Sequence, residues 1–232
     1  SRGLAPYLIS NATRLNPQIA RWIVETKSTV EINLLSHRRE VHDLLAGRRG
    51  ASDQAIQGIT HLAAAGTQPA VVFVATKLNY MDLYRTAELA LTLGATAISY
   101  NRMNLGAYNI RQAERLMPTP AMIRENLDML ESLGAKYGVP ISAAVVIEPC
   151  VVDVSGYTHT FFGWCPQGGE GSYFAVDPSG NLRICNHSPT ILGNLRQESF
   201  LDIYFQHPYL KKFRETLPVE CVDCDPKLRE MC

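Results

Sequence analysis

The sequence of 232 residues lacks several features that mark common functional classes. It has no excess charge, because 22 Lys and Arg balance 22 Asp and Glu, so it carries no electrostatic footprint for nucleic acid or an anionic membrane. No apolar run approaches the roughly 20 residues that span a bilayer, and no signal peptide is visible. We therefore expect a cytoplasmic globular protein that binds neither nucleic acid nor membranes.

Cysteine is absent before Cys150, and five of the six cysteines lie in the last 68 residues, from Cys165 to Cys232. Without a secretory signal, and with a C-x2-C spacing present, this distribution favours metal ligation over disulfides. The candidate ligands are Cys165, Cys185, Cys221, Cys224 and Cys232.

A β-hairpin is predicted inside this cysteine-rich stretch. Residues 172–176 and 182–184 have strand composition, and Asp177-Pro178-Ser179-Gly180-Asn181 between them has turn composition. The hairpin would bring Cys165, before it, close to Cys185, on its return strand. Cys221-x-x-Cys224 forms a second knuckle, of the kind that lets two thiolates share one metal.

The preceding residues predict alternating strands and helices. Strands are expected at 6–10, 30–34, 70–76, 95–100 and 139–147, and the first of them is expected to be buried. Helices are expected to begin at Pro17 and Pro120, after the capping residues Asn16 and Thr119. This alternation is typical of a parallel sheet in an α/β protein. About five strands are too few for a full eight-stranded barrel. We assign residues 1–150 to a partial (β/α) barrel and residues 151–232 to a small cysteine-rich domain.

Three polar residues lie at or just beyond predicted carboxyl ends of strands, namely Asn11, Asn33 and Arg102. In barrels and open parallel sheets the ligand crevice lies at that edge, so these residues are candidates for ligand contact. The alternative is local: Asn commonly begins a loop, and Arg102 would cap a strand end.

The cysteine-rich stretch resembles the SPASM domain, which carries auxiliary [4Fe–4S] clusters in radical S-adenosylmethionine peptide maturases. The resemblance rests on Gly180 four residues before Cys185, on the D-P-S-G-N turn, and on Leu192-Gly193-Asn194-Leu195. Two departures are evident. Seven residues, rather than the usual five, separate Cys224 from Cys232, and the family continues to one or two further cysteines.

The rest of the chain resembles the radical S-adenosylmethionine fold. Residues 8–15 (L-I-S-N-A-T-R-L) resemble the family's I-T-N-G-T-L-L, and residues 39–43 (R-E-V-H-D) resemble its E-V-H-D. Ala12 stands where the family has Gly, Asn33 where it has Ser, and Leu35 where it has Asp. The C-x3-C-x2-C loop of the catalytic cluster is absent, and no Gly-Gly-Glu motif follows an early strand as it does in the family. Gly168-Gly169-Glu170 lies instead between a cysteine and a strand of the cysteine-rich stretch. We therefore expect a piece of a longer protein that lacks the first strands of its barrel.

The resemblance implies an intact enzyme that cleaves S-adenosylmethionine to a 5′-deoxyadenosyl radical and modifies a side chain of a peptide or protein, with a peptide-recognition domain as a further possible partner. Asn11, Asn33 and Arg102 would bind the ribose and the methionine carboxylate. Cys165 and Cys185 would hold one auxiliary cluster, and Cys221, Cys224 and Cys232 a second. The residues given should not cleave S-adenosylmethionine by themselves.

Other interpretations remain open at this point. The first four candidate thiolates could close one tetrahedral zinc site in a non-catalytic binding protein. Cys150 is expected to be a free buried cysteine. His42 is expected to be structural, and His187, two residues after Cys185, to be a loop histidine rather than a cluster ligand.

Overall fold

A computed structural model describes residues 4–67, 69–106, 108–163, 173–216 and 221–225. The chain divides into two compact units. The first comprises the described residues of Ser1–Met103, Arg115–Ile147 and Val151–Gly163, and the second those of Asn104–Glu114, Glu148–Cys150 and Trp164–Cys232. No helix in these described ranges is long and apolar enough to span a membrane.

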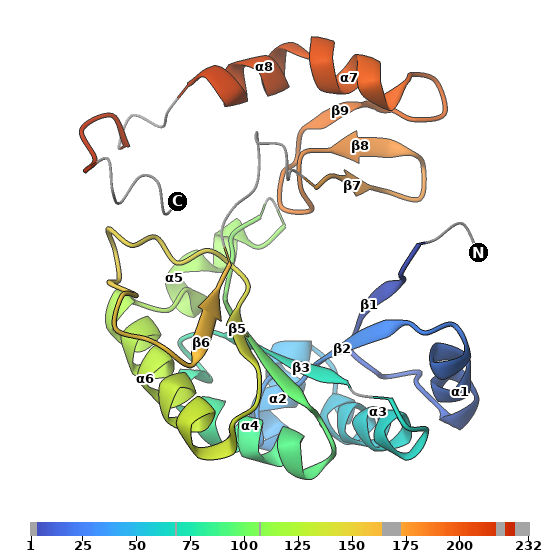
Figure 1. Ribbon diagram of the computed structural model, residues 1–232, viewed down its shortest axis with the longest axis vertical. Helices are drawn as coiled ribbons and strands as arrows, with labels where there is room; N and C mark the ends of the chain where they lie inside the picture. The colour runs from blue at the N-terminus through green and yellow to red at the C-terminus, as the bar shows by residue number, and fades with distance from the viewer. Residues whose placement is uncertain (1–3, 68, 107, 164–172, 217–220, 226–232) are drawn as a thin grey trace. The chain divides into compact units, whose positions relative to one another are not determined.

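A parallel sheet of six strands forms the centre of the first unit (Figure 1). The strands pair in chain order, and every pair is parallel. They are β1 (Tyr7–Ser10), β2 (Thr29–Asn33), β3 (Ala70–Ala75), β4 (Ala97–Arg102), β5 (Ile141–Ala143) and β6 (Thr160–Phe162).

Helices connect successive strands, and two of them begin where the sequence predicts. The side chain of Asn16 accepts a hydrogen bond from Ile19 N at the start of α1, and that of Thr119 accepts one from Met122 N at the start of α6. The helices and 3-10 turns are α1 (Pro17–Glu25), α2 (Arg39–Ala46), α3 (Ala51–Ala64), η1 (Tyr80–Asp82), α4 (Leu83–Thr92), η2 (Ile110–Gln112), α5 (Ala113–Leu116) and α6 (Pro120–Tyr137).

The two faces of the sheet differ in polarity because successive side chains on a strand alternate. On β2, Val30 and Ile32 are buried with the helices in the main core, while Glu31 and Asn33 lie on the other face. Ser99 and Ser142 share that second face, because they lie in register with Asn33 through β3. The second face therefore carries the polar groups that a ligand could reach.

The sheet is curved into an open barrel. Neighbouring strands lie about 4.8 Å apart, so the edges of a flat six-stranded sheet would be separated by roughly 24 Å. Tyr7 on β1 and Phe161 on β6 nevertheless line one cavity of about 280 Å³ together with Glu31 and Ser142. The two edge strands approach each other across the polar face, which confirms the predicted partial (β/α) barrel.

Two details of this sheet differ from the prediction. The first strand is not buried: Leu8 is 43% and Ile9 67% exposed, because β1 is an edge strand that pairs only with β2 among the described residues. A sixth strand, β6, pairs with β5, so the sheet extends beyond the predicted domain boundary at residue 150. The prediction of five strands missed it because Thr160–Phe162 is too short for a recognisable pattern.

The second unit contains the predicted hairpin and a third strand that was not predicted. The Asp177 carboxylate accepts hydrogen bonds from Ser179 N and Asn181 N, and Gly180 adopts a φ of 88°. A small core of Leu182, Ile184, Leu192, Ile203 and Leu210 joins the sheet to two helices. The elements are β7 (Ala175–Val176), β8 (Asn181–Arg183), β9 (Ile191–Asn194), α7 (Phe200–Gln206) and α8 (Pro208–Glu215).

Candidate functional site

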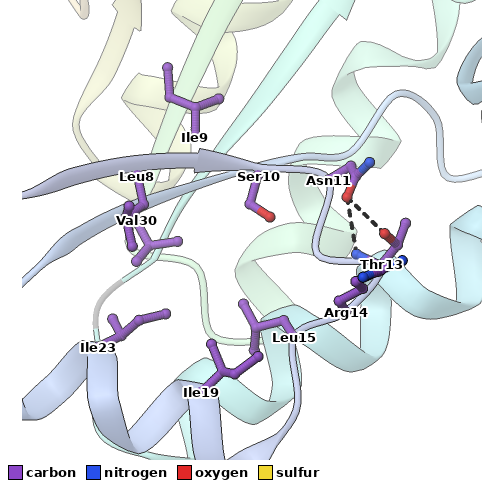
Figure 2. A pocket seen from close by; sticks show the side chains of 10 residues that line it. All are labelled: Leu8, Ile9, Ser10, Asn11, Thr13, Arg14, Leu15, Ile19, Ile23 and Val30. Carbon is purple, nitrogen blue, oxygen red and sulfur yellow. Dashed lines mark hydrogen bonds between the residues drawn. The ribbon is translucent and has the colours of Figure 1, made fainter. Parts of the chain in front are cut away.

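Asn11 lies at the carboxyl end of β1, where a tight loop fixes its side chain. Its Oδ1 accepts hydrogen bonds from Thr13 N at 3.2 Å and from Thr13 Oγ1 at 3.0 Å (Figure 2). Ser10 Oγ accepts a hydrogen bond from Ala12 N. Asn11 Oδ1 is thus occupied locally, and the amide NH₂ remains to contact a ligand.

The loop after β1 lies unusually close to helix α3. Ala12 is buried and has a φ of 57°, a left-handed conformation that few residues with a side chain adopt. A Cβ atom added at Gly58 on α3 would overlap the Ala12 Cβ. The missing side chain of Gly58 therefore allows the loop that carries Asn11 to pack on the helix.

We expect Gly58→Ala to destabilise the first unit by about 1–2 kcal/mol. Overpacking costs about 1–3 kcal/mol, which exceeds the gain of up to about 1 kcal/mol from replacing Gly by Ala in a helix. Gly156→Ala is the matched control, because no atom lies within 4 Å of its added Cβ. Urea denaturation of both variants tests this, and equal stability would contradict the tight contact.

A cavity of about 240 Å³ lies at the carboxyl ends of β1 and β2, and both Asn11 and Asn33 line it with His42. An apolar groove of about 360 Å³ between β1 and α1 also reaches Asn11 and Thr13 (Figure 2). Small-molecule pockets commonly have about 300–1,000 Å³, so the two hollows together could hold an elongated ligand. The Asn33 amide has no hydrogen-bond partner among the described residues.

Buried side chains hold the loop after β2 at one side of this cavity. Leu35 N donates to His42 Nδ1 at 3.2 Å, and Asn79 Nδ2 donates to the Leu35 carbonyl at 2.6 Å. Asn79 is only 1% exposed, and its Oδ1 accepts from Thr76 N and Thr76 Oγ1. Both sides of the Leu35 peptide are thereby fixed, which fixes the position of Asn33 two residues earlier.

A second polar cluster holds the same loop to η1 and α4. The buried Asp82 carboxylate accepts a hydrogen bond from Ser36 Oγ at 2.7 Å and is bound by Arg38 through Nε at 3.0 Å and Nη2 at 2.9 Å. His37 N donates to Thr86 Oγ1 at 2.9 Å. This cluster supports the cavity without lining it.

Asp43, next to His42 on α2, organises the turn into α3. Its carboxylate accepts hydrogen bonds from Gly50 N at 2.6 Å and Ser52 N at 2.9 Å. The backbone N–H groups of Ser52 and Gly50 lower the pKa of Asp43 below its usual value. Burial lowers the pKa of His42, against the opposing influence of the Asp43 charge. The imidazole of His42 is therefore neutral at pH 7.

The structure does not bring Arg102 to this cavity. Arg102 shares a face of β4 with Tyr100, is 7% exposed, and donates from Nε to the Val146 carbonyl at 3.1 Å. It does not line the cavity that Asn11 and Asn33 share. Its contact with a cofactor stays a prediction, as do those of Asn11 and Asn33.

The candidate cluster ligands are only partly covered by the structure, since Cys165 and Cys232 lie outside the described residues. Cys185 follows β8 and is half-buried, and Cys224 N donates to the Cys221 carbonyl at 3.3 Å in a tight turn. All three are free thiols, as is Cys150, which is exposed rather than buried as predicted. Within the described ranges, three or more potential metal ligands do not gather at any point.

Asn79 and Asp82, which are buried, were not predicted from the sequence, and His42 was expected to have only a structural role. A usable signal was present, because Thr76, Asn79 and Asp82 are polar residues that directly follow a strongly apolar strand. His187 makes no hydrogen bond through its buried Nδ1 within the described residues, and burial lowers the pKa of its imidazole.

The open barrel with a cavity at its carboxyl edge, joined in sequence to a cysteine-rich module, defines an α/β-barrel protein with a small cysteine-rich domain. Residues 165–225 match the SPASM iron–sulfur cluster-binding domain, a segment that includes Cys165, Cys185, Cys221 and Cys224 but not Cys232. The match assigns a SPASM domain to residues 165–225, and the chain as a whole is similar to the relatives and solved structures below. The match confirms the iron–sulfur interpretation of the cysteine-rich stretch.

Two curated relatives of the chain are enzymes. The chain is 24% identical to the AdoMet-dependent heme synthase of Methanosarcina barkeri, over 97% of this chain and 68% of that protein. It is 23% identical to the PqqA peptide cyclase of Granulibacter bethesdensis, over 78% of this chain and 48% of that protein.

Solved structures show the same fold at low identity. Streptococcus suis SuiB bound to S-adenosylmethionine matches with a TM-score of 0.74 and 14% identity, over 97% of this chain and 54% of that chain. Native anSMEcpe with bound AdoMet matches with a TM-score of 0.68 and 14% identity, over 97% of this chain and 64% of that chain. The chain thus spans about half to two thirds of the length of its relatives.

Proposed function

We propose that the protein of which this chain forms part is a radical enzyme that binds S-adenosylmethionine at the carboxyl edge of the barrel. The observation that carries the proposal is the cavity shared by Asn11 and Asn33, where the Asn33 amide has no partner among the described residues. SuiB and anSMEcpe, two solved structures of this fold, have S-adenosylmethionine bound, which supports the same ligand here.

The cysteine-rich module would carry the auxiliary [4Fe–4S] clusters. Cys165 and Cys185 are proposed to hold one cluster, and Cys221, Cys224 and Cys232 to contribute to a second. Thiolate is the ligand type that such clusters take, and the described cysteines are free thiols, so the donor set fits. The cofactors would supply the radical chemistry, while the residues of this chain bind, orient and shield the reactants.

A peptide or protein is the proposed substrate class. SuiB has been crystallised with the precursor peptide SuiA and anSMEcpe with the peptide Cp18Cys, and one curated relative is named a peptide cyclase. A peptide-recognition partner belongs to the same proposal. The second candidate is a tetrapyrrole, because the heme synthase matches over 97% of this chain. Candidate peptides and porphyrins can be compared by equilibrium binding to the same protein.

Asn33→Ala should weaken S-adenosylmethionine binding by about 1–2 kcal/mol, or roughly five- to thirty-fold in Kd, because the cofactor would lose one polar contact. Gln18→Ala, which removes an exposed amide of α1 outside the cavity, is the control. Equilibrium dialysis with anaerobic, unreduced full-length protein measures both. Equal affinity in the two variants would show that the cofactor binds elsewhere.

A further inference from the structure

The hydrogen bond between Leu35 and His42 determines which nitrogen of the imidazole carries the proton. A backbone N–H can only donate, so His42 Nδ1 must accept through its lone pair. A neutral imidazole has one protonated nitrogen, which is then Nε2. His42 therefore has its donor on the ring atom that faces away from the Leu35 backbone.

The Nε2–H group of His42 has no acceptor in the described part of the chain. The residue is 3% exposed and nevertheless lines the 240 Å³ cavity with Asn33. Nε2 is not one of the fully covered polar atoms of the described residues, so a group in the cavity can reach this donor. The position of His42 thus points to an acceptor that a ligand brings into the cavity.

The charge of the cavity indicates what kind of acceptor this is. Arg48 is the one charged residue among the described residues that line it, and it makes no ion pair with another described residue. Donor groups of His42 and Asn33 lie with this cation in one cavity. A carboxylate satisfies such a set better than a neutral hydroxyl, because hydrogen bonds to a charged acceptor are stronger.

We propose that His42 Nε2–H donates a hydrogen bond to the methionine carboxylate of bound S-adenosylmethionine. This inference rests on the proposed function and adds a positioning role to a histidine that also supports the loop after β2. Nδ1 holds the loop and Nε2 contacts the ligand, so one side chain links the position of Asn33 to the binding of the cofactor.

His42→Asn separates the two roles. An Asn Oδ1 can take the place of Nδ1 and accept from Leu35 N, while the shorter side chain cannot reach the position of Nε2. The probes are S-adenosylhomocysteine, which retains the carboxylate, and 5′-methylthioadenosine, which lacks the amino-acid part. We expect His42→Asn to raise the Kd for S-adenosylhomocysteine about ten-fold and to leave that for 5′-methylthioadenosine unchanged.

Both probe affinities are measured in the anaerobic full-length protein, with a control variant beside His42→Asn. His61→Asn, outside this cavity, should bind both probes as the unmodified protein does. Equal affinity of His42→Asn and unmodified protein for S-adenosylhomocysteine would overturn the role of His42 and leave the proposed function intact. An equal loss for both probes would also overturn it, since the carboxylate would not be the acceptor. Binding of neither probe by the unmodified protein would overturn the proposed function as well.

Discussion

Cys185→Ala should remove about four iron atoms per chain, the content of one [4Fe–4S] cluster, from anaerobically reconstituted full-length protein. Cys185 is a half-buried free thiol after β8, within the residues that match the SPASM domain. Loss of one thiolate opens the ligand shell that retains a cluster. Iron and sulfide analysis, with the absorbance near 400 nm expected for such clusters, measures the change.

The matched control is Cys150→Ala. Cys150 is also a free cysteine, but it is exposed and lies before the matched residues 165–225. Its substitution should leave the iron content unchanged. If Cys185→Ala retained all its iron, or if both variants lost the same amount, the assignment of Cys185 as a cluster ligand would be wrong.

The second large effect concerns stability. Asp82→Ala should lower the free energy of unfolding of the first unit by about 2–4 kcal/mol. The substitution leaves the Ser36 hydroxyl, which is 0% exposed, without its acceptor and removes the carboxylate that accepts the hydrogen bonds of Arg38. The Arg38 side chain is 46% exposed and can turn to water, which keeps the cost below that of a fully buried ion pair.

Asp53→Ala provides the comparison. Asp53 pairs with Arg39 at 2.8 Å, but the two side chains are 44% and 68% exposed. Exposed ion pairs contribute about 0–1 kcal/mol, so this variant should be nearly as stable as the unmodified protein. Urea denaturation followed by far-ultraviolet circular dichroism tests both variants. Similar losses in the two would show that the Asp82 cluster does not stabilise the fold as its burial implies.

Local signals explain which elements could be predicted. Asn16 and Thr119 precede Pro17 and Pro120, and each caps a helix through contacts within three residues. The three-residue strand β6 could not be found in this way, because its order comes from pairing with β5 some twenty residues earlier. The exposure of β1 likewise depends on its place at the sheet edge and not on its composition.

In the candidate site, too, some residues have a local sequence signal and others depend on contacts between distant parts of the chain. Strand ends are recognisable in sequence. The rule that ligands bind at the carboxyl ends of parallel strands singled out Asn11 and Asn33, which line one cavity. A position at a strand end does not say on which face of the sheet the side chain lies. Arg102 lies on the face of β4 that carries the buried Tyr100. Because side chains alternate along a strand, Asn101 lies with Ser99 on the polar face of the sheet, whereas Arg102 does not. The polar run after β3 marks Asn79 and Asp82, but their contacts with Leu35 and Ser36 connect residues more than forty positions apart, so the sequence does not show these partners.

The close approach of Ala12 and Gly58 leaves room for one methyl group between the β1 loop and α3. The two positions are therefore energetically coupled, and the effect of a substitution at one depends on the residue at the other. Ala12→Gly would relieve the left-handed backbone of residue 12 and vacate the space that a methyl at residue 58 needs. Among homologous sequences, a side chain at the equivalent of position 58 should accordingly be accompanied by glycine at the equivalent of position 12.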